Sequence, residues 1–120
     1  MLLDWLGLSI GAALGAISRF FVTNYINRFW HFSFPIATFS INLVGAFALA
    51  SLYARNNGTN HMLYLFTFGI GFLGSFTTFS TFMYESSVLM DRRAVVSSLS
   101  YLSLSVILGI FFAWSGRHIL

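Results

Sequence analysis

Hydroxyl groups and phenylalanine rings alternate in one short segment, residues 71–82, which reads Gly-Phe-Leu-Gly-Ser-Phe-Thr-Thr-Phe-Ser-Thr-Phe. The serine and threonine hydroxyls can donate and accept hydrogen bonds, and three of the phenylalanines recur at every third position. Polar groups inside an apolar chain are typical of a cavity or a pore lining, because lipid cannot satisfy irregular backbone. The segment is therefore the first candidate for a functional site.

The stretch that carries this segment, residues 61–90, is too long for a straight membrane helix. About thirty residues would rise ~45 Å at 1.5 Å per residue, whereas the hydrocarbon core of a bilayer is ~30 Å thick. Glycine and threonine both weaken a helix, so we expect a break near residues 74–78. Carbonyls left free at such a break suit a small cation such as Na⁺. The alternative is an unbroken helix whose hydroxyls bond back to their own i−4 carbonyls.

The composition places the chain in a membrane. Of its 120 residues, 58% are hydrophobic and 8% are charged, and the mean hydropathy is +0.82, whereas roughly a quarter of the residues of a soluble domain are charged. The first stretch lacks a basic amino-terminal region, which indicates a retained helix rather than a secretory signal. We predict an all-α membrane protein, a single domain over residues 1–120 with four transmembrane helices. The apolar stretches that are long enough to cross a bilayer are residues 4–26, 33–54, 61–90 and 94–116.

The arginines bear on orientation. With an even number of helices, Arg55 and Arg117 share one side of the membrane, and Arg28, Arg92 and Arg93 share the other. A difference of two against three is too small to fix one orientation by the positive-inside rule. We therefore expect dual topology and an antiparallel homodimer, the arrangement that larger transporters reach with inverted repeats. The alternative is that folding or another protein fixes one orientation.

The first stretch carries a regular series of small residues. Gly7, Gly11 and Gly15 are four residues apart, which lets another helix approach closely and is how we expect such a dimer to pack. Arg19 is the next step on the same stripe, so it should point into protein, and an intramembrane arginine is a candidate for function. The alternative is that Arg19 snorkels to the lipid head groups.

Asn42 is the most polar side chain of the second stretch. It shares a helix face with Thr38 and with Gly45 or Ala46 by the i, i+3, i+4 rule. Its amide could hold helices together, but it also offers two donors to an anion.

Three blocks of the sequence resemble the Fluc/CrcB family of fluoride channels, and the resemblance covers essentially the whole chain. They are residues 11–20 (Gly-Ala-Ala-Leu-Gly-Ala-Ile-Ser-Arg-Phe), residues 38–47 (Thr-Phe-Ser-Ile-Asn-Leu-Val-Gly-Ala-Phe) and residues 71–82. The third block is the most specific. The departures are mild: Ala12 and Ala37 stand where glycine is common, and Phe20 where tyrosine is common.

The resemblance implies a dual-topology, antiparallel homodimer with two fluoride pores along the subunit interface. It also implies a central Na⁺, held by backbone carbonyls that map to Gly74 and Thr77. In such channels an asparagine on the second helix contacts fluoride, and two phenylalanines at the break form an aromatic box. A polar track on the last helix begins with a tyrosine and a serine, and hydroxyls on other helices are weaker candidates. With the intramembrane arginine added, the candidate pore residues are Asn42, Phe79, Phe82, Ser80, Thr38, Tyr101, Ser105 and Arg19.

The residue types suit fluoride for a physical reason. Fluoride is small and tightly hydrated, so a pore must replace its water with several donors, which hydroxyls and amides supply without the trap of a full positive charge. The edge of a phenyl ring carries the positive part of its quadrupole and can join them. We expect a passive channel in the inner (plasma) membrane that lowers cytoplasmic fluoride. Its partners would be fluoride, a second copy of the chain and lipid head groups rather than nucleic acid.

Other classes of protein explain the sequence less well. A small multidrug-type exporter also has four helices and dual topology, but we would expect an acidic residue deep in its first helix, and Asp4 lies at the very start. A non-conducting structural protein explains the glycines but not the hydroxyl groups. We do not expect an enzyme, because the sequence offers no paired carboxylates, nucleophile–base pair or metal cluster.

Overall fold

The computed structural model describes residues 1–55 and 62–119, and most of them are helical. In chain order the helices are α1 (Leu2–Phe29), α2 (Ile36–Arg55), α3 (Met62–Tyr64), the π-helix η1 (Leu65–Leu73), α4 (Gly74–Phe76), α5 (Ser80–Asp91) and α6 (Val95–Ile119).

In the described part of the chain, four helical runs are long and apolar enough to cross a membrane: Leu2–Phe29, Ile36–Arg55, Leu65–Asp91 and Val95–Ile119. This confirms the predicted all-helical fold with four helices that can span a bilayer. The predicted third stretch begins at residue 61, which lies outside the described residues, as does residue 120 at the end of the predicted domain.

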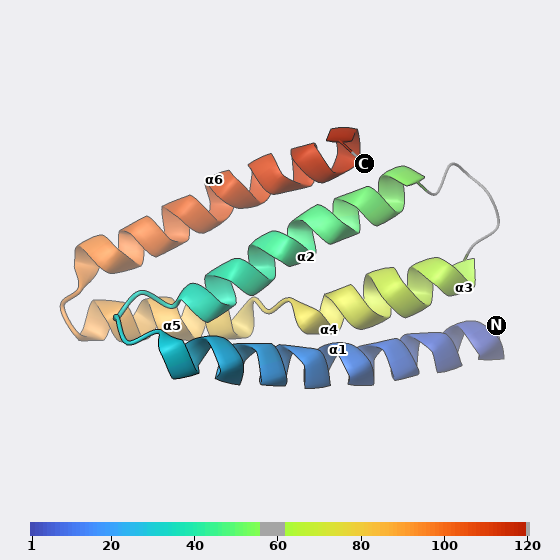
Figure 1. Cartoon of the computed structure of the whole chain (residues 1–120), viewed down its shortest axis with the longest axis horizontal. Helices are drawn as coiled ribbons and strands as arrows, with labels where there is room; N and C mark the ends of the chain where they lie inside the picture. The colour runs from blue at the N-terminus through green and yellow to red at the C-terminus, as the bar shows by residue number, and fades with distance from the viewer. Residues whose placement is uncertain (56–61, 120) are drawn as a thin grey trace.

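The helices run alternately in opposite directions, so both chain ends lie at the same end of the molecule (Figure 1). α1 packs along η1 and α4, and α2 packs along α6, while α5 packs against the first part of α6. In Figure 1, α2 lies between α6 and the α1–η1 pair. This path places the end of α1 and the α5–α6 turn at the opposite end of the molecule from the two termini.

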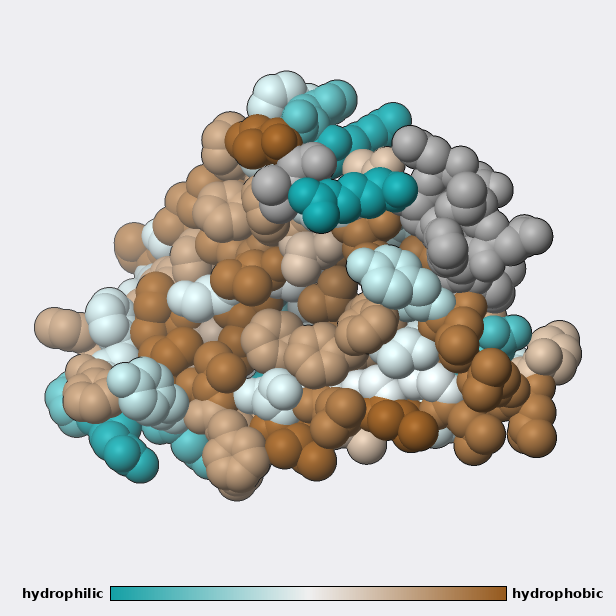
Figure 2. Space-filling view, turned by 45° about the vertical axis from the view of Figure 1, so that its right-hand side comes forward, coloured by the Kyte–Doolittle hydropathy of each residue, from teal (hydrophilic) through white to brown (hydrophobic). Residues whose placement is uncertain are grey.

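The outer surface is apolar. Phe21, Ile107 and Phe111 are each more than half exposed, and Figure 2 shows a mostly hydrophobic face with the hydrophilic groups mainly near its edges. A soluble protein would bury such side chains, whereas a membrane protein turns them toward lipid.

The glycine series of α1 packs against the chain's own third helical run. A Cβ atom on Gly11 would overlap the backbone carbonyl of Thr67, and one on Gly15 would overlap the carbonyl of Phe72. The small residues therefore bring α1 into backbone contact with η1. The expectation that this series packs a second copy of the chain was wrong, because its partner lies in the same subunit.

The π-helix was not predicted from the sequence. It covers nine residues, Leu65–Leu73, directly after the short α3. A π turn closes its hydrogen bonds from i to i+5 rather than i to i+4 and is wider, so it rises less per residue. The close approach of Gly71 to the backbone of α1, where a Cβ would lie 2.7 Å from the carbonyl of Leu8, holds this wider turn against its neighbour.

Helical structure stops after Phe76 and resumes at Ser80. Thr77 has an extended backbone, with φ −78° and ψ 160°, and Figure 1 shows the non-helical link between α4 and α5. We call residues 77–79 the interruption.

A tight turn joins α5 to α6. The N–H of Ala94 donates to the carbonyl of Leu89, and the N–H of Arg93 donates to the carbonyl of Met90, which is the Schellman pattern at a helix end. Arg93 has the left-handed backbone that this pattern requires, with φ 60°. The turn folds α6 back on α5, where the hydroxyls of Ser86 and Ser98 meet at 2.9 Å.

Candidate functional site

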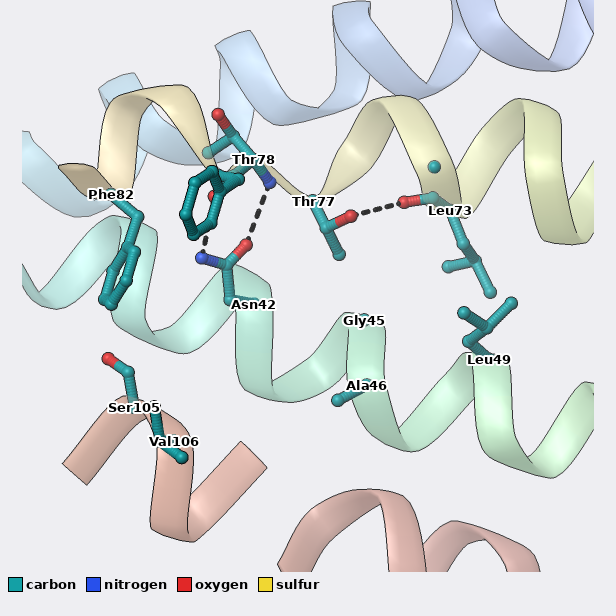
Figure 3. A pocket seen from close by; sticks show the side chains of 12 residues that line it. Asn42, Gly45, Ala46, Leu49, Leu73, Thr77, Thr78, Phe82, Ser105 and Val106 are labelled. Atoms are coloured by element: carbon teal, nitrogen blue, oxygen red, sulfur yellow. Dashed lines mark hydrogen bonds between the residues drawn. The ribbon is translucent and has the colours of Figure 1, made fainter. Parts of the chain in front are cut away.

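The side-chain amide of Asn42 bridges the interruption from α2 (Figure 3). Its Nδ2 atom donates to the carbonyl of Thr78 at 3.0 Å, and the backbone N–H of Thr78 donates to its Oδ1 atom at 2.9 Å. An N–H or C=O group left without a partner away from water costs about 1–3 kcal/mol. Asn42 therefore makes the non-helical backbone at Thr78 tolerable in an apolar surrounding.

Hydroxyl groups close the two helix ends on either side of the interruption. The Oγ1 and N–H of Thr77 both donate to the carbonyl of Leu73, at 2.9 and 3.0 Å. The methyl group of Thr77 fills the space beside Gly45, where a Cβ would overlap it. On the other side, the Oγ1 of Thr78 accepts from the N–H of Thr81 at 3.2 Å and caps the start of α5.

The interruption leaves carbonyl oxygens unused. Because the N–H of Thr78 turns to Asn42, it does not donate to the carbonyl of Gly74. No backbone amide of the described residues, 1–55 and 62–119, donates to the carbonyls of Gly74, Ser75 or Phe76 across the helix end. Gly74 is itself exposed on the subunit surface. Carbonyl oxygens at a helix end are ligands that suit Na⁺.

Arg19 reaches the interruption from the other side. It is half-buried on α1, and its Nη1 atom donates to the carbonyl of Thr77 at 3.3 Å. The side chain therefore points into protein along the glycine stripe, as predicted, rather than toward the head groups. Its guanidinium group shares the Thr77 carbonyl that the resemblance assigned to Na⁺.

A groove of about 430 Å³ lies where α2, α6 and the interruption meet, and we call it the central groove. Figure 3 shows the Asn42 amide, the Phe82 ring and the Ser105 hydroxyl around this space. The residues that line it are Asn42, Gly45, Ala46, Leu49, Leu73, Gly74, Thr77, Thr78, Phe79, Phe82, Ser105 and Val106.

The two predicted phenylalanines differ in burial. Phe82 is 9% exposed, and its ring lies edge to face against Tyr101, with centroids 5.0 Å apart. Phe79 is 74% exposed, with its centroid 6.0 Å from that of Phe82. One ring is thus fixed inside the subunit, and the other projects from its surface beside the central groove.

The hydroxyl of Ser105 differs from the other polar groups of the site in its hydrogen bonding. Its Oγ is buried and has no hydrogen-bond partner, and it is the one buried side-chain nitrogen or oxygen of which this holds in the part of the chain that the structure describes. Buried polar groups normally have partners. A buried hydroxyl without a partner, on a residue that lines a groove, is therefore suited to a ligand or water that reaches it.

Glu85, for which the sequence predicted no role, lies beside the site. The hydroxyl of the fully buried Tyr101 donates to its carboxylate at 3.4 Å, and Thr38 on α2 lies next to this pair. These residues come from three different helices, so no spacing in the sequence signals the cluster.

The structure gathers part of the predicted set and separates the rest. The predicted residues that line the central groove are Asn42, Phe79, Phe82, Ser105, Gly74 and Thr77. A second cavity, of about 320 Å³, contains Arg19 and Thr38 together with Thr78 and Thr81. Tyr101 lies beneath Phe82, and the exposed Ser80 lies 3.4 Å from the Thr78 hydroxyl and lines neither cavity. The roles given to these residues remain predictions.

The fold and the groove together define a multi-pass membrane protein with hydrogen-bonding groups beside an interruption in its third helical run. The family model described as "CrcB-like protein, Camphor Resistance (CrcB)" matches residues 6–117, and the chain belongs to this family.

Proteins similar to this chain carry a common name. A "Fluoride-specific ion channel FluC 2" of Bacillus cereus is 42% identical over 118 residues, which cover 98% of both chains. The "Fluoride-specific ion channel FluC 1" of Carboxydothermus hydrogenoformans is 36% identical over 115 residues, 96% of this chain and 91% of that protein. A "Fluoride-specific ion channel FluC" of Campylobacter jejuni is 37% identical over 118 residues, 97% of this chain and 96% of that protein.

We predict that Asn42→Ala lowers the free energy of unfolding by about 2 kcal/mol, because it leaves both backbone groups of Thr78 without partners. Thermal unfolding in detergent, followed by circular dichroism, measures the change. Val44→Ala is the matched control, since Val44 lies on the same helix and is 55% exposed. Equal effects of the two substitutions would show that the amide bridge does not stabilise the interruption.

Proposed function

We propose that the protein is a fluoride-selective ion channel that conducts passively. The observation that carries the proposal is the Ser105 hydroxyl, buried without a partner beside the same groove as the Asn42 amide and the Phe82 ring. The names of the relatives support fluoride as the ion. They also support a channel rather than an enzyme or a multidrug-type exporter.

The chemistry of the groove fits a dehydrated anion. The Asn42 amide has two N–H bonds, and one of them is used by the Thr78 carbonyl, which leaves the other for the groove. A hydroxyl and a ring edge add donors without a full positive charge. Fluoride could therefore exchange water for protein donors and still leave, as conduction requires.

We propose further that the working unit is an antiparallel homodimer of dual topology. Phe79 is 74% exposed on the isolated subunit, although it lies beside the central groove. At the exposed Gly74 an added Cβ would meet nothing nearer than a carbonyl 3.9 Å away, so packing within the subunit does not account for this glycine. Both observations support a second copy of the chain against this face, with each pore drawing on both subunits.

The same proposal includes a Na⁺ ion between the subunits. The carbonyls of Gly74, Ser75 and Phe76 would supply oxygen ligands, because the helix end leaves them without amide partners. Thr77 is a weaker ligand than the sequence suggested, since its carbonyl accepts from Arg19. The ion would add positive charge next to the anion pathway and hold the two interruptions together.

The direction of transport follows from the chemistry of fluoride. It crosses membranes as HF, ionises in the more neutral cytoplasm and then needs a route out. A passive channel in the inner (plasma) membrane would supply this route and lower cytoplasmic fluoride. The apolar outer surface and the four long helices support the membrane setting.

The first test of the function is Ser105→Ala in liposomes loaded with fluoride. We expect fluoride efflux to slow about tenfold, the effect of one lost hydrogen bond of ~1.4 kcal/mol. The melting temperature should stay the same or rise, because the change removes an unpartnered buried hydroxyl. A fluoride electrode reads the efflux, and chloride-loaded liposomes report selectivity.

Ser103→Ala is the matched control for that experiment, because Ser103 is exposed on the same helix. Efflux that is unchanged in both variants would remove Ser105 from the pathway. Equally fast release of fluoride and chloride by the unmodified protein would contradict fluoride selectivity itself.

Dual topology is tested by charge. Two or three added arginines at the end of the molecule that holds both termini should force one orientation and abolish efflux. Arginines added at the α5–α6 turn should force the other orientation, and co-expression of the two forms should restore efflux. A single-orientation form that conducts by itself would rule out the antiparallel dimer.

The sodium ion is tested by replacement with a heavier monovalent cation and anomalous crystallographic scattering. We expect density between the subunits near the carbonyls of Gly74 to Phe76. Thr77→Ser should leave this density unchanged because backbone atoms are the ligands, whereas Gly74→Leu should abolish it by crowding the interface. Water alone at this position in sodium buffer would contradict the proposal.

A further inference from the structure

A further groove, separate from the two cavities described above, lies between α2 and α6 near their carboxyl ends. Its volume is about 750 Å³, and we call it the terminal groove. Figure 2 shows hydrophilic surface at the top of the molecule, where α6 ends, above hydrophobic surface. The residues that line the groove are Ala50, Tyr53, Ala54, Ile110, Ala113, Trp114, Arg117 and His118.

The lining changes character along α6. Ile110 lies deepest toward the middle of the helix, Ala113 and Trp114 follow one turn later, and Arg117 and His118 stand at the helix end. The rings of Trp114 and His118 are in contact, with centroids 4.9 Å apart. The groove thus passes from aliphatic to aromatic to cationic, in the order that a bilayer passes from its acyl chains to its interface and head groups.

The groove is open because its walls are small. Ala50 and Ala54 on α2 face Ala113 on α6, and these side chains end at a methyl group. Elsewhere the same two helices touch closely: a Cβ on Gly116 would overlap the carbonyl of Phe47. The close contact at Gly116 fixes the distance between the two helices. The alanines beside this contact leave the terminal groove open, and an acyl chain could fill it.

We propose that the terminal groove binds an anionic phospholipid. The guanidinium of Arg117 would bind the phosphate of the head group, since arginine matches the geometry of phosphate oxygens, and the imidazole of His118 would add a hydrogen bond. With the head group at Arg117, Trp114 and Tyr53 would lie at the depth of the glycerol region, as interfacial aromatic residues do. None of the described residues that line the groove is acidic, so its charge is complementary to that of the phosphate.

A second copy of the chain is a poorer occupant of this groove. In the antiparallel dimer of the proposed function, on which this step rests, the partner brings its α5–α6 turn to the same side of the membrane. That turn carries Arg92 and Arg93 next to a single acidic residue, Asp91, so its net charge is positive. The arginines of that turn would then approach Arg117 and repel it, whereas the phosphate of an anionic lipid would neutralise these positive charges.

The experiment is native mass spectrometry of the delipidated protein, titrated with phosphatidylglycerol or with phosphatidylcholine of the same acyl chains. We expect phosphatidylglycerol to bind more tightly. Arg117→Gln should weaken its binding about fivefold, the effect expected for one cation near a head group. Ala113→Leu, which fills the groove without changing charge, should weaken both lipids. Arg28→Gln, at the opposite end of the molecule, is the control and should change neither.

Each outcome bears on the proposal. Equal binding of the two lipids, or no effect of Arg117→Gln, would overturn the role of charge. No effect of Ala113→Leu would show that the lipid lies on the surface and not in the groove. Displacement of the lipid by inorganic phosphate alone would indicate a site for a free anion instead. Because binding is measured without flux, failure here leaves the channel proposal intact, and a protein that binds lipid but does not conduct fluoride would refute only the channel.

Discussion

The bridge between the Asn42 amide and the backbone of Thr78 is the interaction on which the site depends. In lipid, a backbone N–H or C=O that leaves a helix has no water to turn to, and the asparagine supplies both missing partners at 3.0 and 2.9 Å. Once Thr78 is satisfied from α2, the carbonyl of Gly74 loses its normal amide partner. The open carbonyl of Gly74, a residue that lines the central groove, follows from this exchange of partners.

The bridge can form only because the helices that carry it are fixed. Gly11 and Gly15 bring α1 into contact with the backbone of η1, and Gly45 leaves room for the methyl group of Thr77. A methyl group added at Gly11 or Gly15 would overlap a backbone carbonyl of η1 and push the two helices apart by more than a hydrogen bond can stretch. Close packing through small residues, which supplies the association that lipid does not, therefore sets the register between Asn42 and Thr78.

The sequence predicts the features that depend on local chemistry. Four apolar stretches indicated the four helices, and the hydroxyl-rich segment at residues 71–82 supplied the candidate site, whose role stays a prediction. It did not predict the π-helix Leu65–Leu73 or the contact of Glu85 with Tyr101, because both arise between helices that are distant in sequence. The glycine series showed that a helix would approach α1 closely, but nothing in its spacing could distinguish a helix of the same chain from that of a partner.

Asn42 shows why the sequence alone does not separate a structural role of a polar side chain from a role in binding a ligand. The choice between an amide that holds helices together and an amide that offers donors to an anion was open, and the structure shows the first role for one N–H and the carbonyl oxygen. The second N–H is left beside the central groove, because an amide nitrogen has two. Aspartate would keep the acceptor for Thr78 but place a negative charge beside the groove that we propose for an anion, and alanine would keep neither partner. Only a side chain with one acceptor, two donors and no charge, at this length, meets both demands.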